Sequence, residues 1–189
     1  WRTTNFIVNL TASDLTSGVA YVNYSYDGGV VQQVAANYAD VSINSNGNKT
    51  LTYSATDVAG LTSVPVTINV ALDTTVPAVS DNAPLTWQTL PFDFTISAVD
   101  VDSGIQSITY AVDGVETVIN AVNEVNVSIA TDGNHTVTYN ATNNAGLLSA
   151  QNTINVLLDS AIPVVSDNAP VGWQTQDFNF TINASNGPS

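Results

Sequence analysis

The octapeptide Ser80-Asp81-Asn82-Ala83-Pro84-Leu85-Thr86-Trp87 decides how the chain is organised, because it occurs twice. A close copy, Ser166-Asp167-Asn168-Ala169-Pro170-Val171-Gly172-Trp173, begins 86 positions later, and the chain opens on a third tryptophan, Trp1, 86 positions before Trp87. A shift of 86 positions also aligns, without a gap, Phe6 with Phe92 and Phe178, Gly18 with Gly104, Tyr24 with Tyr110, and Pro77 with Pro163. A fixed period of this kind is the signature of a tandem array.

The period divides the chain into three units. We expect a first unit over residues 1–72 that lacks its first strand, a complete second unit over 73–158, and a third unit over 159–189 that holds only its first strands. The third unit would leave Phe178 and Phe180 without core partners. Two explanations stay open: the sequence is a segment of a longer array, which we favour, or neighbouring subunits complete each other by exchanging strands.

The composition restricts the classes of partner. The formal net charge is −14, with Arg2 and Lys49 as the only basic residues, so binding to nucleic acid or direct insertion into a membrane is not expected. A hydrophobic content of 44% is enough for small cores. The chain contains no Cys and no Met, and we expect a signal peptide to have been removed or to lie outside this sequence.

Strand patterns dominate the second unit. Apolar and polar residues alternate from Phe92 to Ala98, and a second alternating run ends at Asp113-Gly114, which favours a tight hairpin turn. A Pro-containing stretch, Val76–Val79, predicts an outer first strand, since Pro is confined to sheet edges. About seven short strands without a helical window predict an all-β fold of tandem β-sandwiches.

Three motifs of the second unit resemble the Ig-like repeats of large bacterial and archaeal cell-surface proteins. They are Tyr110–Gly114, Gly133–Thr142 and Asn144–Gly146, which are similar to the family patterns Y-S-x-D-G and G-x-H-T-V-x-Y-x-A-T-D-x-A-G-N. The first unit carries the same motifs, with Lys49 where the family often has His. The resemblance implies Ig-like sandwiches and leaves function open, because such modules serve as spacers, adhesins and lattice subunits.

Catalysis is not expected. His135 is the only His, and its counterpart in the first unit is Lys49. A catalytic group should keep its identity between copies, so we interpret both as turn residues. An enzymatic role would require a further domain.

Acidic loops predict a candidate calcium site at the junction before the second unit. In an Ig-type sandwich the loops containing Asp100, Asp102 and Asn143 lie at the pole where Asp73 enters, and carboxylate and amide oxygens are ligands for Ca²⁺. The alternative is that these are ordinary turn residues. The first unit has Thr16 in place of Asp102.

Asn-x-Ser/Thr sequons occur eight times and predict glycosylation. By strand parity all of them fall on outward faces or in turns: Asn9, Asn23, Asn48, Asn126, Asn134, Asn140, Asn179 and Asn183. Asn48 and Asn134 occupy equivalent turn positions and are the first candidates.

The aromatic repeat markers have two interpretations. Trp87 and Trp173 could stack on sugar rings, but we expect them to fill space under the first turn of their own sandwich. Tyr53 and Tyr139 resemble the tyrosine corner of such sandwiches, and we expect them to be core residues.

These observations favour an extracellular structural protein at the cell surface, a glycosylated Ig-like array that builds a surface layer, sheath or filament. Its expected partners are copies of itself. The alternative is an adhesin stalk or a carbohydrate-binding accessory module of a secreted enzyme. Each unit should lengthen the array by roughly 35 to 45 Å.

Overall fold

The computed structural model describes residues 1–186, which form strands and no helix. The prediction of an all-β fold is therefore confirmed. The strands are β1 (Phe6–Thr11), β2 (Val19–Tyr26), β3 (Gln32–Val34), β4 (Tyr38–Ile43), β5 (Gly47–Asp57), β6 (Val66–Leu72), β7 (Ala78–Asp81), β8 (Phe92–Val99), β9 (Ile105–Val112), β10 (Val115–Asn120), β11 (Glu124–Ile129), β12 (Gly133–Asn143), β13 (Asn152–Leu158), β14 (Val164–Asp167) and β15 (Ile182–Ser185). No helix among these residues is long and apolar enough to cross a membrane.

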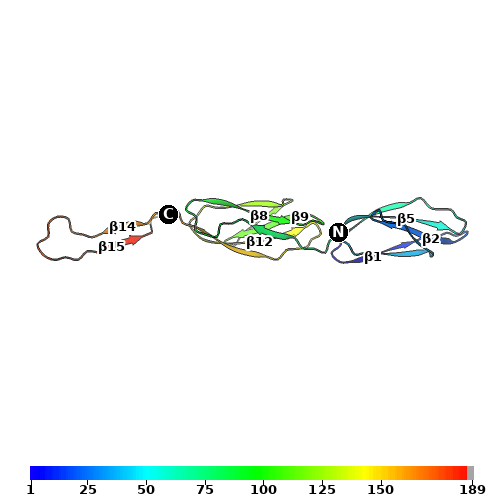
Figure 1. Cartoon of the computed structure of the whole chain (residues 1–189), viewed down its shortest axis with the longest axis horizontal. Helices are drawn as coiled ribbons and strands as arrows, with labels where there is room; N and C mark the ends of the chain where they lie inside the picture. Colours follow the sequence, from blue (N-terminus) through cyan, green and yellow to red (C-terminus); the bar gives the residue numbers. More distant parts are fainter. Residues whose placement is uncertain (187–189) are drawn as a thin grey trace.

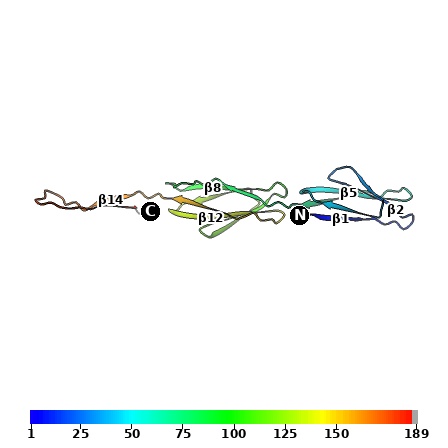
Figure 2. The same ribbon diagram turned by 60° about the horizontal axis from the view of Figure 1, so that its bottom comes forward.

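The second unit is a sandwich of two antiparallel sheets. One sheet has the strand order β11-β8-β7 and the other has the order β10-β9-β12-β13. Strands β8 and β12 belong to opposite layers, which separate clearly in Figure 2. Strand β10, the fourth strand of this unit, lies at the edge of the larger sheet and pairs with β9.

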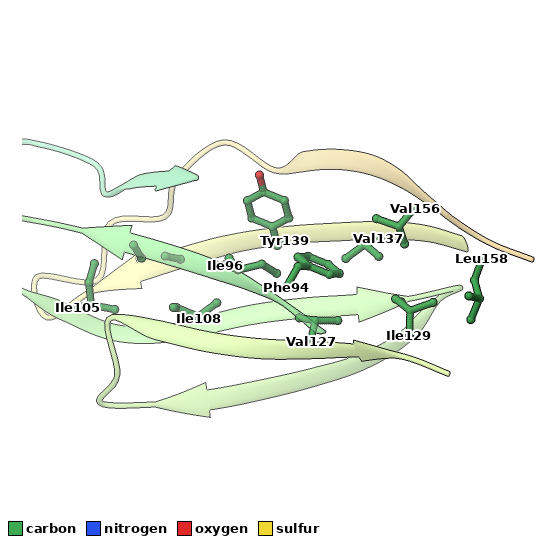
Figure 3. Close-up of a cluster of buried hydrophobic side chains, with 12 residues drawn as sticks. Phe94, Ile96, Ile105, Ile108, Val127, Ile129, Val137, Tyr139, Val156 and Leu158 are labelled. Atoms are coloured by element: carbon green, nitrogen blue, oxygen red, sulfur yellow. The ribbon is translucent and has the colours of Figure 1, made fainter. Parts of the chain in front are cut away.

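Alternating side chains from both sheets build the core of the second unit. Phe94 and Ile96 from β8 lie between the layers with Val127 from β11 and Val137 and Tyr139 from β12 (Figure 3). These five side chains are buried because every second residue of a strand faces the same side of its sheet.

The first unit repeats this arrangement with one strand fewer. Its sheets have the strand orders β1-β4 and β3-β2-β5-β6, and Leu10, Val22, Val41 and Leu51 lie in its core. Among residues 1–186, no strand pairs with the other edge of β1, where β7 pairs with β8 in the second unit. Within the described part of the chain, β1 therefore pairs with β4 alone.

The predicted turns and edges follow from backbone chemistry. Asp113 and Gly114 both have positive φ, of 49° and 83°, which is the two-residue turn that Asp-Gly favours. The first strand of the second unit begins at Ala78, two residues later than the sequence predicted. Pro77 has no N–H to donate to a neighbouring strand, which accounts for the later start.

The third unit is a hairpin of β14 and β15 with no second layer among the described residues. Phe178 and Phe180 each expose half of their surface and lie 6.3 Å apart between ring centroids. The end of the predicted third unit, residues 187–189, lies outside the described residues. The three units follow one another along the long axis, with the hairpin and the first unit at opposite ends (Figure 1).

Candidate functional site

The junction between the first two units is organised around the buried side chain of Asn143. Its amide Nδ2 donates to Asp73 Oδ2 at 2.9 Å, to Asp100 Oδ2 at 3.1 Å and to the carbonyl oxygen of Thr75 at 3.0 Å. Asn143 and Asp73 are both fully buried. The amide thus holds the linker and the loop after β8 together.

The strand pattern explains why a polar side chain faces inward here. Asn143 is the last residue of β12 and lies on the same buried face as Tyr139 and Ala141. A β-bulge shifts the register beside it, since Thr142 pairs with Ser107 whereas Asn143 pairs with Ile105. The alternation along β12 is unbroken through Tyr139, Ala141 and Asn143, so the amide faces inward toward the entering linker.

Asp100 closes the loop after β8. Burial raises the pKa of Asp100, but hydrogen bonds from Asn143 and from the backbone N–H groups of Ser103 and Gly104 outweigh burial and hold the pKa below its usual value. Asp14 accepts the equivalent backbone bonds in the first unit, from Ser17 at 2.8 Å and from Gly18 at 3.0 Å. The loop aspartate therefore has a structural role in both units.

Asp102 faces the first unit. Its Oδ2 accepts a hydrogen bond of 3.0 Å from Nδ2 of Asn46, which lies in the turn before β5. Nδ2 of Asn46 also donates to Thr75 at 2.9 Å, and its Oδ1 accepts from the backbone N–H of Thr74 at 3.2 Å. At the next junction Asp132 takes the place of Asn46 and accepts from the backbone N–H of Ser160 at 3.0 Å. Asn46 was not among the sequence candidates, and its position 86 residues before Asp132 is the signal that identifies it.

The residues of the predicted calcium site do not fit an ion in this arrangement. Asn143 turns its N–H groups toward Asp73 and Asp100, while its oxygen accepts backbone bonds from Ala145 at 3.1 Å and Leu147 at 2.8 Å. The amide thus occupies the place that a bridging cation would take. Among residues 1–186, no three carboxylate or imidazole side chains are grouped closely enough to hold a metal. Calcium at this junction stays a prediction that would require the Asn143 amide to turn over.

The interpretation of His135 and Lys49 as turn residues is wrong, because both lie within strands, β12 and β5. His135 Nδ1 donates to Asp113 Oδ2 at 2.7 Å, and its Nε2 donates to the carbonyl oxygen of Thr131 at 2.8 Å. Lys49 Nζ lies 2.8 Å from Asp27 Oδ2 at the equivalent place. Each unit therefore uses a cation on its long strand to hold the aspartate of its Asp-Gly turn.

These pairs shift the ionisation of both partners. The hydrogen bond to Asp113 and the bond to the carbonyl oxygen of Thr131 raise the pKa of His135. Conversely, the bonds from His135 and from the backbone N–H of Thr136 lower the pKa of Asp113. In the first unit the bond to Asp27 raises the pKa of Lys49. Both ring nitrogens of His135 are donors, so the protonated ring is the favoured form.

Tyr139 is a core residue, as expected from the sequence, with 2% of its surface exposed. Its hydroxyl donates to the carboxylate of Asp81 on β7 and accepts a bond of 3.2 Å from Asn152. Burial and the Asp81 carboxylate raise the pKa of Tyr139. Tyr53 is only half-buried, and no hydrogen-bond partner for its hydroxyl is present among residues 1–186.

The expected packing of the tryptophans is wrong for Trp87, which exposes 56% of its surface. Trp1 is similarly exposed, and Trp173 lies fully exposed on the coreless hairpin. Trp1 precedes Arg2, which forms a backbone bridge to Leu72, and Trp87 precedes Gln88, which forms the equivalent bridge to Leu158. Leu72 and Leu158 each end the last strand of their unit. The backbone contact, and not burial of the indole, is therefore the structural feature that recurs with the tryptophan.

The predicted sequons differ in accessibility. Asn23 and Asn140 are half-buried, and six are exposed: Asn9, Asn48, Asn126, Asn134, Asn179 and Asn183. Asn9 donates from Nδ2 to Asp40 at 2.6 Å and Asn23 donates to Thr56 at 3.1 Å. Asn48 and Asn134 lie near the start of β5 and β12 and not in turns as predicted. Within residues 1–186, no side-chain hydrogen bond involves either of them.

The fold and the junction define a class, a tandem array of small β-sandwiches joined end to end by hydrogen bonds at their linkers. No protein-family model matches the chain, and no curated protein matches it. Among solved structures it is similar to the fibronectin(III)-like modules of Clostridium thermocellum CbhA, with 18% identity, coverage of 83% of this chain and 86% of that one, and a TM-score of 0.37. A structure from a 1.5-MDa bacterial ice-binding adhesin is also similar, with 14% identity, coverage of 89% of this chain and 63% of that one, and a TM-score of 0.37. These likenesses concern the fold and nothing further.

Proposed function

We propose that this chain is an extracellular structural protein in which β-sandwich units joined end to end build part of a cell-surface layer, sheath or filament. The observation that carries the proposal is the junction between the first two units. Asn143 binds both Asp73 and Asp100 inside it, and Asn46 reaches from one unit to Asp102 of the next. The Asn143 amide fixes the start of the linker to the second unit, and the exposed or partly buried bonds of Asn46 join the two units directly. Together these bonds resist bending, which suits a load-bearing or spacing role.

The charge distribution supports a role outside the cell without nucleic acid or lipid partners. The acidic surface has a net charge of −14, which keeps separate copies apart unless a specific contact joins them. We propose that each unit acts as a spacer of fixed length and carries no catalytic group of its own.

Glycosylation is the finer part of the proposal. Asn48 and Asn134 are exposed, make no side-chain hydrogen bond among the described residues and occupy equivalent positions in their units. Asn48 lies on β5 and Asn134 on β12, which are inner strands of their sheets, so glycans there would cover the outer face of each sheet. Intact-mass measurement on material from the native source tests this part, and a mass equal to that of the bare polypeptide would remove it.

Electron microscopy of the native cell surface tests the architectural role. Antibody against this chain should label the outside of intact cells and decorate a layer or fibre with an axial period of roughly 35 to 45 Å per unit. Labelling confined to the cell interior would refute the proposal. Surface labelling on isolated, flexible threads would favour the alternative of an adhesin stalk.

Exposed tryptophans favour a second candidate, a carbohydrate-binding accessory module. Trp1 and Trp87 are both exposed at equivalent positions of the first two units, and a flat aromatic face can stack on a sugar ring. Affinity electrophoresis in polysaccharide gels distinguishes this candidate, since retardation that is lost in Trp87→Ala would support it.

A further inference from the structure

The turn between β4 and β5 contains the dipeptide Asn46-Gly47, directly at the junction of the first two units. Asparagine is a chemically labile residue, and it loses its side-chain amide most readily before glycine, which has no side chain to shield its backbone nitrogen. The same dipeptide occurs at one other place in the sequence, Asn186-Gly187. The two pairs therefore share their local chemistry, and the contacts of each asparagine decide how fast it reacts.

Two separate structural requirements place Asn46 and Gly47 next to each other. Gly47 has a φ of 115°, and Gly133 has a φ of 145° at the equivalent start of β12, a backbone conformation that favours glycine. Asn46 meets a linker that offers both an acceptor and a donor. Its amide nitrogen donates to the hydroxyl of Thr75, and its oxygen accepts from the backbone N–H of Thr74. The reactive pair thus follows from the geometry of the junction.

The second junction has no amide at the same place. Asp132 stands where the first junction has Asn46, and it accepts hydrogen bonds from the backbone N–H and the hydroxyl of Ser160 at 3.0 and 2.9 Å. Ala161 takes the place of Thr75 and offers no side-chain acceptor. A side chain that donates is therefore required at the first junction and not at the second.

The amide of Asn46 is held by the linker and by the second unit. Nδ2 lies 2.9 Å from Thr75 Oγ1 and 3.0 Å from Asp102 Oδ2, and Oδ1 accepts two bonds of 3.2 Å from Thr74. Loss of the amide requires the side chain to fold back over its own backbone, which breaks these bonds. The carboxylate of Asp102 also disfavours the negative charge that develops on the amide during attack. The closed junction therefore protects Asn46.

We propose that Asn46 is a site of spontaneous deamidation, which occurs when the junction opens and permanently weakens it. The backbone nitrogen of Gly47 attacks Cγ of Asn46, the Cγ–Nδ2 bond breaks, and ammonia leaves with the proton of the Gly47 N–H. Water then opens the succinimide ring at one of its two carbonyl carbons, which gives aspartate or isoaspartate. Asn46 is half-buried and both Thr74 and Thr75 are exposed, so water reaches the site.

The product changes the charge at the junction. A carboxylate at position 46 faces the carboxylate of Asp102, at the place where the Asn46 amide now donates over 3.0 Å. The two negative charges repel each other, and the donor to Thr75 is lost. Isoaspartate also adds one methylene group to the main chain ahead of β5. This inference concerns the chemistry of one junction and goes beyond the proposed function, because it holds whatever the array builds.

Peptide mapping of the full chain after incubation at mildly alkaline pH tests the reactivity. Asn186 is exposed and serves as the reference in the same molecule. Asn46 should deamidate at least about tenfold more slowly than Asn186, because it reacts only in the open fraction of the junction. Asp102→Ala removes a hydrogen bond to a charged group and should speed the reaction at Asn46 about tenfold.

Glu116→Ala is the matched control, since it removes an exposed carboxylate on β10 of the same unit and should change neither rate. Equal rates at Asn46 and Asn186 in the wild type would overturn the proposed protection. An Asn46 that stays intact in Asp102→Ala while Asn186 reacts would overturn the site itself.

Pulsed electron paramagnetic resonance tests the consequence for the junction. Spin labels at Ser42→Cys and Ser128→Cys occupy exposed positions on either side of it. Asn46→Asp should broaden the distance distribution, whereas Asn44→Asp adds the same charge at an exposed position of the same turn and should leave it unchanged. No broadening in Asn46→Asp, or equal broadening in both variants, would overturn the proposed weakening. A distribution that is already broad in the wild type would instead contradict the rigid spacing, and peptide mapping would still decide on the site.

Discussion

Replacing Asn143 with Ala should selectively destabilise the second unit. The side chain is fully buried and supplies two N–H donors that are shared among three acceptors, while its oxygen accepts two backbone N–H groups. Each buried polar group left without a partner costs ~1–3 kcal/mol. Asp73 retains its bond from Ser103 at 2.5 Å, so we expect a loss of about 3–5 kcal/mol from the other groups that lose their partner.

Urea unfolding combined with hydrogen exchange measures this loss unit by unit. Protection of the β12 and β13 amides should fall by the full amount, while protection of the β5 and β6 amides in the first unit should not change. Asn134→Ala is the matched control, because Asn134 lies on the same strand but is exposed and should change stability by no more than about 0.5 kcal/mol. A loss below about 1 kcal/mol for Asn143→Ala would refute the role of this amide.

Three further predictions concern the turn pair, the metal and the core tyrosine. Because the folded pKa of His135 is raised and that of Asp113 is lowered, their pair stabilises the second unit between those two values. The contribution of His135 to stability is complete below its unfolded pKa of about 6.5 and is lost as pH rises through the folded pKa. In thermal melts, His135→Lys should therefore keep the stability of the second unit constant further into the alkaline range. An unchanged pH profile in this variant would contradict the prediction. Adding a chelator should leave the melting temperature unchanged, because the Asn143 amide already joins the carboxylates at the junction. A drop of several degrees would instead support calcium. Tyr139→Phe should cost the second unit roughly 1–2 kcal/mol in urea unfolding by removing the bond to Asp81, whereas Tyr53→Phe in the first unit should be neutral, and equal losses would refute the difference between the units.

The strands and turns could be predicted because they depend on local chemistry. Alternation from Phe92 to Ala98 fixes which side chains face inward, and Asp113-Gly114 fixes the hairpin turn. The exposure of Trp87 could not be predicted, since it depends on whether another element covers the indole. An internal repeat identifies that a residue recurs, but it does not tell whether the side chain or the backbone is the reason.

The junction illustrates the same limit for polar residues. The sequence indicated that Asp73, Asp100 and Asn143 would lie near one pole, and the structure brings them within hydrogen-bond distance. The direction of the Asn143 amide was not predictable, because it is set by the loop N–H groups of Ala145 and Leu147. That direction decides whether the Asn143 side chain donates hydrogen bonds to the carboxylates or presents its oxygen as a ligand for a cation.

We propose that successive units hold a fixed orientation at a constant spacing. Ser42 and Ser128 are exposed and occupy equivalent positions on β4 and β11, so spin labels attached to Ser42→Cys and Ser128→Cys report the axial repeat directly by pulsed electron paramagnetic resonance. We predict one narrow distance distribution centred at roughly 35 to 45 Å. A broad distribution spread over tens of ångströms would mean that the units swivel freely, and the account of a rigid hydrogen-bonded junction would be wrong.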